Sequence, residues 1–378
     1  MTINSSDLIN KPSTKLYGLD HLRALAICFV FMYHYSGMFP SPPWLSSISK
    51  FGWTGVDLFF VLSGYLISSQ LFASIAAGKT ISFKTFFLKR FFRIIPGYLF
   101  IVGIYFLIPS SHEREALAPL WKYISFTQNL GLDLRHQGTF SHAWSLCIEE
   151  QFYLLLPLLL ILLSSRKKIK WGPALFLIFF LGGLLYRLLV YTQVAAPALE
   201  ADGGWAIWYK WIYYPTPARL DGLLTGVGIA ALFCFYPAIK EKLTCRPILF
   251  LLAGLLLLVV SYWICTDERS FAASVFGFPL ISLGYGLWLI AALSPGSFLY
   301  KYRCWPTEKL AMLSYAIYLS HKIVIHLGQI LFSKYNIEGA SNTMFIACIL
   351  LSVLAGWLMH LAIEMPFLRL RQRILSNQ

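Results

Sequence analysis

Long apolar stretches alternate with short polar segments along the whole chain, and the length of these stretches predicts the fold. A helix needs about 20 mostly apolar residues to cross a bilayer. The stretches that meet this requirement lie near 20–39, 55–76, 91–109, 145–163, 172–193, 213–236, 247–264, 272–294, 309–333 and 343–367. Arg219 and Asp221 interrupt the start of the sixth stretch, and Glu149 and Glu150 lie near the start of the fourth. The pattern predicts an all-α polytopic membrane protein with about ten transmembrane helices.

Positive charges predict the orientation of these helices, because loops rich in Lys and Arg stay in the cytoplasm. With a cytoplasmic N-terminus, 21 of the 31 Lys and Arg residues fall on the cytoplasmic side, seven on the outer side and three within the spans. We therefore expect one integral-membrane domain over 1–378, with spans over about 20–367 and short cytoplasmic tails at 1–19 and 368–378. The outer segments 110–144 and 194–212 are long enough to form caps or short interfacial helices.

The composition supports a membrane domain and argues against other classes of protein. Hydrophobic residues make up 58% of the chain and charged residues 13%, and the mean hydropathy is +0.65. A soluble domain carries roughly a quarter charged residues. A basic cytoplasmic face that meets anionic lipid explains the net charge of +14, so we expect no nucleic-acid partner. The seven cysteines form no C-x-x-C pair, so we expect neither a disulfide framework nor a metal site.

A histidine, His34, lies within the apolar stretch "FVFMYHYSG" of the first predicted span. A buried polar group costs several kcal/mol unless it is paired, so this imidazole needs a partner or a function. Arg23 precedes it by eleven residues, which places both on nearly the same helix face, about 16 Å apart along the axis. His34 is either a packing histidine bonded to a neighbouring helix or a catalytic base.

The second span opens with "GWTGVDLFFVLSGYLIS", and its Asp57 lies at a depth close to that of His34. A carboxylate that accepts a hydrogen bond from one ring nitrogen would fix the tautomer of the imidazole and raise the basicity of the other nitrogen. Asp57 can equally satisfy free backbone N–H groups at the start of its helix. The two roles are compatible.

The segment "FFLKRFFRIIPGY" places Arg90 and Arg93 on one face at the cytoplasmic end of the third span. Two guanidinium groups side by side can bind phosphate oxygens in a two-pronged manner. The alternative is an ordinary basic flank of a membrane helix.

The fourth span begins with "SHAWSLCIEEQFYLLLP", in which His142, Ser145 and Glu149 form one polar face. Glu149 and Glu150 are about 100° apart on a helix and cannot both point the same way. Two acids at this position exceed what capping requires, which favours a function.

Two further polar residues fall within predicted spans. Arg219, in "TPARLDGLLTGV", could orient a carboxylate such as Glu149 or bind substrate. His321, in "LSYAIYLSHK", is either a packing histidine or a second functional imidazole.

Together these segments resemble the membrane acyltransferase family 3. The start "LDHLRALAICFVFMYH" matches the family's pattern of a basic residue, ten residues and a histidine, here Arg23 and His34. Arg90 and Arg93 match its Arg-x-x-Arg motif. Further matching segments, in family order and over nearly the whole chain, are "GVDLFFVLSGYLI", "WSLCIEEQFYLLLP", "ARLDGLLTG", "LSYAIYLSH" and "IEMPF".

The resemblance implies transfer of an acyl group, usually acetyl from cytoplasmic acetyl-coenzyme A, to a hydroxyl of an extracytoplasmic glycan or glycoconjugate. Acceptors in the family include O-antigens of lipopolysaccharide and exopolysaccharides, and the expected location is the bacterial inner membrane. Some members carry a fused soluble domain; because this sequence ends eleven residues after "EMPF", we expect none here. The oligomeric state, including a homo-oligomer, is left open.

The resemblance also implies roles for the polar residues. Catalysis is assigned to His34, with Asp57 or Glu149 orienting it, and His34 acts as a base or a transient acyl carrier. Donor binding is assigned to Arg23, Arg90 and Arg93, and substrate binding to Glu150, Ser145, His142, Arg219 and His321; no metal is expected. The aromatic segment "EADGGWAIWYKWIYYP" is suited either to sugar stacking or to an interfacial belt.

Two alternatives stay open at this point. A transporter or flippase of a lipid-linked sugar would also line its path with buried charges. The same scaffold could use another acyl donor, such as succinyl-coenzyme A. A scaffold without activity is disfavoured because the motif residues are intact.

Overall fold

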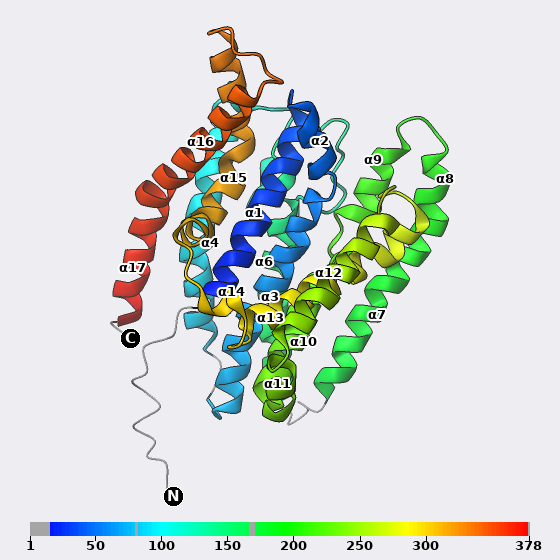
Figure 1. The fold of residues 1–378 in the computed structure, drawn as a ribbon, viewed down its shortest axis with the longest axis vertical. Coiled ribbons are helices and arrows are strands. Elements are labelled where there is room, and N and C mark those ends of the chain that lie inside the picture. Colours follow the sequence, from blue (N-terminus) through cyan, green and yellow to red (C-terminus); the bar gives the residue numbers. More distant parts are fainter. Residues whose placement is uncertain (1–15, 80–81, 166–170, 377–378) are drawn as a thin grey trace, which may run out of the picture.

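The computed structural model describes residues 16–79, 82–165 and 171–376, and within these ranges the chain folds into helices without any strand (Figure 1). The long helices are α1 (Tyr17–Met38), α3 (Gly55–Ala76), α4 (Phe83–Leu107), α6 (Trp144–Ser165), α7 (Gly172–Val190), α10 (Asp221–Phe235), α12 (Pro247–Ile264), α13 (Phe278–Leu293), α15 (Trp305–Ser333) and α16 (Asn342–Met359).

Short helices connect or extend these long ones. The α-helical ones are α2 (Pro43–Ser49), α5 (Leu120–Ile124), α8 (Ala196–Leu199), α9 (Gly204–Trp208), α11 (Pro237–Thr244), α14 (Phe298–Lys301) and α17 (Met365–Ser376). The 3₁₀ turns are η1 (Gly52–Thr54), η2 (Pro109–Ser111), η3 (Ser141–Ala143) and η7 (Thr216–Ala218). The π-helical turns are η5 (Tyr191–Ala195), η6 (Tyr209–Tyr213), η8 (Ala273–Gly277) and η9 (His360–Glu364). Both long outer segments of the prediction therefore contain short helices.

The chain is an all-α, multi-pass membrane protein. Eight helices in the described ranges are long and apolar enough to cross a membrane, and nine if α10 and α11, bent by 113°, count as one span. A long helix occupies each of the ten predicted positions, but α1, with Asp20, Arg23 and His34, is not among the apolar ones. The predicted number of ten spans therefore exceeds the eight or nine that length and composition support.

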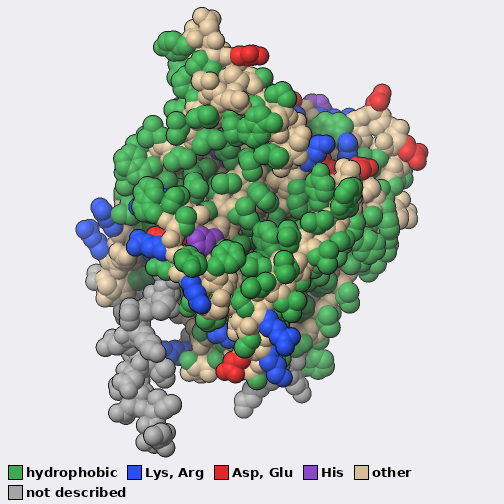
Figure 2. Space-filling view, viewed as in Figure 1, with side chains coloured by type: hydrophobic (Ala, Val, Ile, Leu, Met, Phe, Trp, Pro, Cys, Tyr) green, Lys and Arg blue, Asp and Glu red, His purple; other side chains and the backbone are tan. Residues whose placement is uncertain are grey.

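Exposed apolar side chains cover much of the surface that would face lipid. On the face drawn in Figure 2, hydrophobic side chains cover most of the middle of the molecule, and Lys and Arg side chains lie mainly toward its lower end. Large exposed hydrophobic residues come from the outer helices, for example Leu181, Leu256 and Leu350. The cytoplasmic position of both termini stays a prediction, and residues 1–15 of the predicted N-terminal tail lie outside the described residues.

The centre of the bundle is formed by α1, α3, α10, α13 and α15. The apolar windows of α13 and α15 are 72% and 67% buried, against 11% for α7 and 17% for α12, so the latter two lie at the periphery. α3 and α10 pack backbone to backbone: a Cβ atom on Gly64 would lie 2.1 Å from the carbonyl oxygen of Leu223. Small residues allow such close approach between membrane helices.

Two predicted boundaries differ from the structure. α4 begins at Phe83 rather than near 91, because Ser82 caps it by accepting a hydrogen bond from the backbone N–H of Thr85 (3.3 Å). Arg90 and Arg93 consequently lie inside the helix. The predicted span 213–236 breaks at its start into η6, η7 and α10. Pro215 and Pro217 lack the N–H groups that a continuous helix needs there.

Candidate active site

Two cavities inside the described part of the bundle are lined by seven of the predicted site residues, whereas Asp57, Glu150, Arg219 and His321 line neither of them. We call the larger one, of about 260 Å³, the histidine cavity because His34 and His142 line it. The smaller one, of about 120 Å³, is the arginine cavity, lined by Arg23, Arg90 and Arg93. The spacing of Arg23 and His34 along α1 thus places one residue in each cavity.

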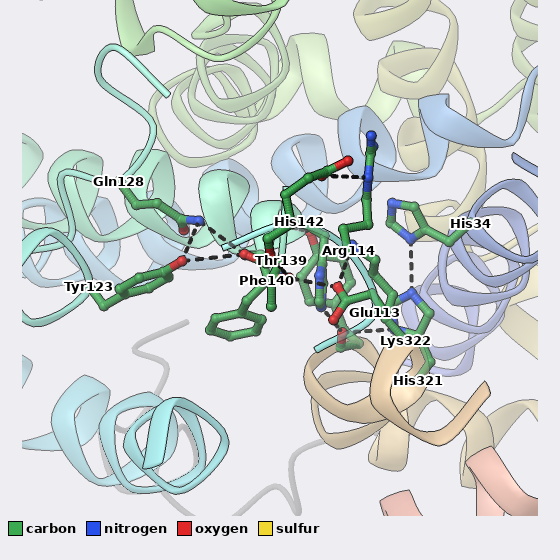
Figure 3. A network of polar contacts seen from close by, with 12 residues as sticks. His34, Glu113, Arg114, Tyr123, Gln128, Thr139, Phe140, His142, His321 and Lys322 are labelled. Atoms are coloured by element: carbon green, nitrogen blue, oxygen red, sulfur yellow. Dashed lines mark hydrogen bonds and ion pairs between the residues drawn. The ribbon is translucent and has the colours of Figure 1, made fainter. Parts of the chain in front are cut away.

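Three histidines from distant parts of the chain meet at the histidine cavity (Figure 3). His34 comes from α1, His142 from η3 and His321 from α15. Nδ1 of His34 lies 2.8 Å from Nε2 of His321. The ring centre of His142 is 5.7 Å from that of His34 and 5.1 Å from that of His321.

The hydrogen-bond partners of His321 fix the tautomers of this pair. Nδ1 of His321 lies 2.9 Å from the carbonyl oxygen of Tyr318 and 3.1 Å from that of Ile317. A carbonyl oxygen only accepts, so in the neutral ring Nδ1 carries the proton and Nε2 bears a lone pair. His34 must then donate its Nδ1–H to that lone pair. The consequence is that the lone pair of His34 resides on Nε2, on a ring that lines the histidine cavity.

Asp57, expected to orient His34, has a different partner. Its Oδ1 accepts a hydrogen bond from Nη2 of Arg219 at 2.8 Å, and both side chains are buried. It makes no side-chain cap at the start of α3 either. The prediction that Asp57 contacts His34 is therefore wrong, because the guanidinium group of Arg219, which directly follows η7, binds the Asp57 carboxylate instead.

The ion pair of Asp57 and Arg219 supports an aromatic wall of the histidine cavity. The Arg219 guanidinium lies 4.1 Å from the ring centre of Phe278, 4.6 Å from that of Tyr213 and 5.0 Å from that of Trp144. The aromatic residues that line the cavity are Tyr33, Trp53, Trp144, Trp205, Tyr209, Tyr213, Tyr214 and Tyr318.

A second buried ion pair anchors the chain on both sides of Arg219. Arg187 of α7 binds Asp221 with both guanidinium nitrogens, at 2.6 and 3.1 Å, and donates to the carbonyl oxygen of Ala218 at 2.6 Å. Arg187 thus anchors residues 218–221, which follow the aromatic segment 205–214. Trp211 of that segment is 42% exposed, whereas Tyr213 and Tyr214 are buried against the cavity. Part of this segment therefore faces outward and part lines the histidine cavity.

Glu113 and Lys322 form a buried ion pair beside the histidines (Figure 3). The sequence analysis did not predict this pair. Nζ of Lys322 lies 2.8 Å from Oε1 of Glu113, which also accepts a hydrogen bond from the backbone N–H of Phe140. Burial alone would raise the pKa of Glu113, but the Lys322 charge and these hydrogen bonds outweigh burial and lower it. A lysine within a span, directly after His321, was a signal that a carboxylate partner should exist.

The arginine cavity gathers three guanidinium groups, and Glu149 is the one carboxylate in its described lining. Arg23 of α1 has Asp20 at 3.7 Å, and Nε of Arg90 is buried without a hydrogen-bond partner among the described residues. A buried donor without a partner is costly, so such a group is expected to meet an acceptor from a ligand. These residues could hold an anionic donor molecule.

Glu149 belongs to the arginine cavity and not to His34. Its two oxygens accept hydrogen bonds from Ser63 at 2.8 Å and from Tyr153 at 3.2 Å. The expected contacts of Glu149 with His34 and with Arg219 are therefore absent among the described residues. Glu150 lines neither cavity, and its Oε1 is buried without a hydrogen-bond partner in the described part of the chain.

Tyr318 lies between the two cavities, and its hydroxyl group contacts a residue from the lining of each. That group donates to the carbonyl oxygen of His142 at 2.7 Å and lies 2.6 Å from Oγ of Ser145. Ser145 lines the arginine cavity, and His142 lines the histidine cavity. The polar face predicted for the fourth span thus has its residues on both sides of Tyr318.

Comparison with known proteins identifies the family of the chain. A family model described as an acyltransferase domain matches residues 16–361. The O-acetyltransferase OatA of Staphylococcus aureus strain NCTC 8325 / PS 47 is 29% identical over 372 residues, which cover 93% of this chain and 57% of that protein. OatA of strain COL has the same identity and coverage. The chain thus spans little more than half the length of these relatives, and no solved structure matches it. Since the family match includes every helix that lines the two cavities, the chain belongs to the membrane acyltransferase family 3.

Proposed function

We propose that the protein is a membrane O-acetyltransferase that moves an acetyl group from acetyl-coenzyme A to a hydroxyl group of an extracytoplasmic glycan. The observation that carries this proposal is the adjacency of the two cavities. One presents three guanidinium groups against a single lining carboxylate, and the other presents the lone pair of His34 beside an aromatic wall. The names of the relatives support O-acetyl transfer.

The arginine cavity is the proposed donor site. Arg23, Arg90 and Arg93 would bind the phosphate groups of the donor, because guanidinium forks match phosphate oxygens. Acetyl-coenzyme A supplies an acetyl group activated as a thioester. Glu149, Ser63 and Tyr153 line the path between the arginines and Tyr318, and their oxygens can accept hydrogen bonds from amide groups along the donor's arm.

His34 is the proposed general base. Its Nε2 lone pair takes the proton of the acceptor hydroxyl while the hydroxyl oxygen forms a bond to the acetyl carbon. The bond between that carbon and sulfur breaks, and His34 returns the proton to the departing thiolate. The same lone pair can instead attack the acetyl carbon first, so that His34 carries the acetyl group before the hydroxyl takes it.

His321 takes the positioning role that the sequence analysis gave to a carboxylate. By accepting the Nδ1–H of His34, it keeps the lone pair on Nε2, and the backbone carbonyls of Ile317 and Tyr318 hold His321 in turn. Asp57 and Arg219 act at a distance by supporting the aromatic wall.

The histidine cavity is the proposed acceptor site. Tyr and Trp rings offer flat apolar faces with polar edges, which suit the faces and hydroxyl groups of a sugar ring. O-antigens and exopolysaccharides carry such rings. The proposed location is the bacterial inner membrane, with the arginine cavity on the cytoplasmic side. The final acceptor is reached by this membrane domain or through a separate partner protein.

Release of coenzyme A from acetyl-coenzyme A by the purified protein in nanodiscs tests the proposal. Wild type should release coenzyme A when cell-envelope glycans are present, and His34→Ala should nearly abolish this. A double Arg90→Ala, Arg93→Ala variant should need a higher donor concentration. Each variant is checked for an intact fold by its thermal stability. If wild type binds no acetyl-coenzyme A and releases none, the proposal fails and a sugar flippase becomes the better explanation.

A further inference from the structure

The linings of the two cavities have two residues in common. Val56 of α3 and Tyr318 of α15 line both the histidine cavity and the arginine cavity, and the other lining residues belong to one cavity each. Both side chains are 5% exposed. These two side chains therefore form the wall between the proposed donor site and His34.

The Tyr318 side of this wall is held by hydrogen bonds. Its single hydroxyl proton goes to the carbonyl oxygen of His142, so Ser145 must donate its own proton to the Tyr318 oxygen. The ring also meets that of Phe59, with centres 6.2 Å apart. Val56 is fixed by its helix: it follows Gly55, at which an added Cβ would lie 2.6 Å from the carbonyl oxygen of Ala26. The wall is therefore tightly packed on both sides.

We propose that Val56 and Tyr318 form a partition that selects the acyl group by size. This inference rests on the proposed function, because it requires an acyl group that passes from the arginine cavity to Nε2 of His34. The direct route between the two cavities crosses the wall that the two residues share. A close-packed wall resists even one extra methylene group, and apolar sites that discriminate by one methylene do so by about 10- to 200-fold.

Substitutions at Val56 change the width of the partition in opposite directions. Val56→Ala removes two methyl groups and opens it, whereas Val56→Ile adds one methylene group and narrows it. Val61→Ala is the matched control, because Val61 is a buried valine of the same helix, α3, and lines neither cavity. Tyr318→Phe keeps the ring but removes both hydrogen bonds that hold it.

The test measures coenzyme A release by each variant with acetyl-, propionyl- and butyryl-coenzyme A. We expect wild type to be slower with each added methylene, and Val56→Ala to raise the butyryl-to-acetyl rate ratio by about 10-fold or more. Val56→Ile should lower the propionyl-to-acetyl ratio. Tyr318→Phe should raise the butyryl-to-acetyl ratio, and Val61→Ala should leave it within about threefold of wild type.

The outcomes separate this inference from the proposed function. If wild type releases coenzyme A from the acetyl donor but neither Val56→Ala nor Tyr318→Phe changes the chain-length profile, the partition is not the size filter. The partition is also excluded as the filter if Val61→Ala shifts the profile as far as Val56→Ala. If Val56→Ala does not fold, the Val56→Ile and Tyr318→Phe profiles decide. If wild type releases no coenzyme A from any donor, the proposed function itself fails.

Discussion

Nδ1 of His34 lies 2.8 Å from Nε2 of His321, and the hydrogen-bond chain that starts there ends on the backbone carbonyls of Ile317 and Tyr318. A base in an enzyme is often oriented by a carboxylate, as Asp57 was expected to do. Here a neutral imidazole fixes the tautomer without adding negative charge next to the base. The buried pair of Lys322 and Glu113 lies beside it.

The positioning role of His321 predicts a specific kinetic defect. We expect His321→Ala to lower kcat about 10-fold, which corresponds to one lost hydrogen bond of about 1.4 kcal/mol. KM for acetyl-coenzyme A should not change, because the proposed donor site is the other cavity. His321→Gln, whose side-chain carbonyl can accept the Nδ1–H of His34, should recover part of the loss. Steady-state kinetics check this, with His326→Ala on the same helix as control. Wild-type kcat in a folded His321→Ala variant would contradict the role.

The arginine cavity predicts that Arg90 and Arg93 recognise the phosphate end of the donor. We expect each Arg→Gln change to raise KM for acetyl-coenzyme A by about 10- to 100-fold, because charge-assisted hydrogen bonds contribute about 1.5–3 kcal/mol. The penalty should vanish with acetyl-pantetheine, which carries no phosphate. Lys89→Gln is the matched control, since Lys89 is a cation on the same helix outside the cavity. An equal penalty with both donors would rule out phosphate recognition.

The ion pair of Asp57 and Arg219 predicts an effect on the acceptor rather than on the donor. Asp57→Asn leaves a buried guanidinium without its counter-charge, and loss of one partner of a buried pair costs about 3–5 kcal/mol of stability. Where the variant still folds, the aromatic wall should shift, so KM for the glycan should rise while KM for acetyl-coenzyme A stays. Initial rates at varied concentrations of each substrate check this. A selective rise in donor KM would be the contrary result.

The lowered pKa of Glu113 predicts how stability depends on pH. A carboxyl group whose pKa is lower in the folded state stabilises the fold above its unfolded value of about 4.3, and this contribution is lost as pH falls through the folded pKa. Wild type should therefore lose thermal stability below about pH 4. The Glu113→Gln variant should be less stable than wild type at neutral pH, by about 3–5 kcal/mol. It should also lack the loss of stability that titration of Glu113 causes in wild type at acid pH. Scans of unfolding temperature against pH check this. Identical profiles would show that the pair contributes nothing.

Matched removal of both charges provides the control for this experiment. The double variant Glu113→Gln, Lys322→Met removes both charges of the pair. It should therefore regain part of the stability that Glu113→Gln loses. If the double variant is less stable than Glu113→Gln alone, Lys322 stabilises the fold mainly through a partner other than Glu113.

The sequence predicted the fold well because membrane helices follow from local composition. A run of about 20 apolar residues must form a helix in lipid, whatever its neighbours are. The exceptions are instructive: the start of α4 was missed because its first turn is polar, and the sixth span was broken by prolines beside Arg219. Both depend on local caps and breaks that a hydropathy pattern does not contain.

Partners between helices were much harder to predict. Helical periodicity predicts which residues of one helix share a face, as for Arg23 and His34 of α1. It does not show which distant helix lies opposite, and His34 and His321 are 287 residues apart in the chain. For the same reason Asp57 was predicted with the wrong partner, and Glu149, which was expected to orient His34, lines the arginine cavity instead.

The most direct measurement of the central claim is a cryo-electron microscopy structure with a ketone analogue of acetyl-coenzyme A, in which a methylene group replaces the thioester sulfur. The account predicts phosphate density against Arg90 and Arg93, an arm that passes Glu149, and a carbonyl group between Val56 and Tyr318 within reach of Nε2 of His34. An analogue bound with its carbonyl group remote from His34, or with its phosphates outside the arginine cavity, would contradict it.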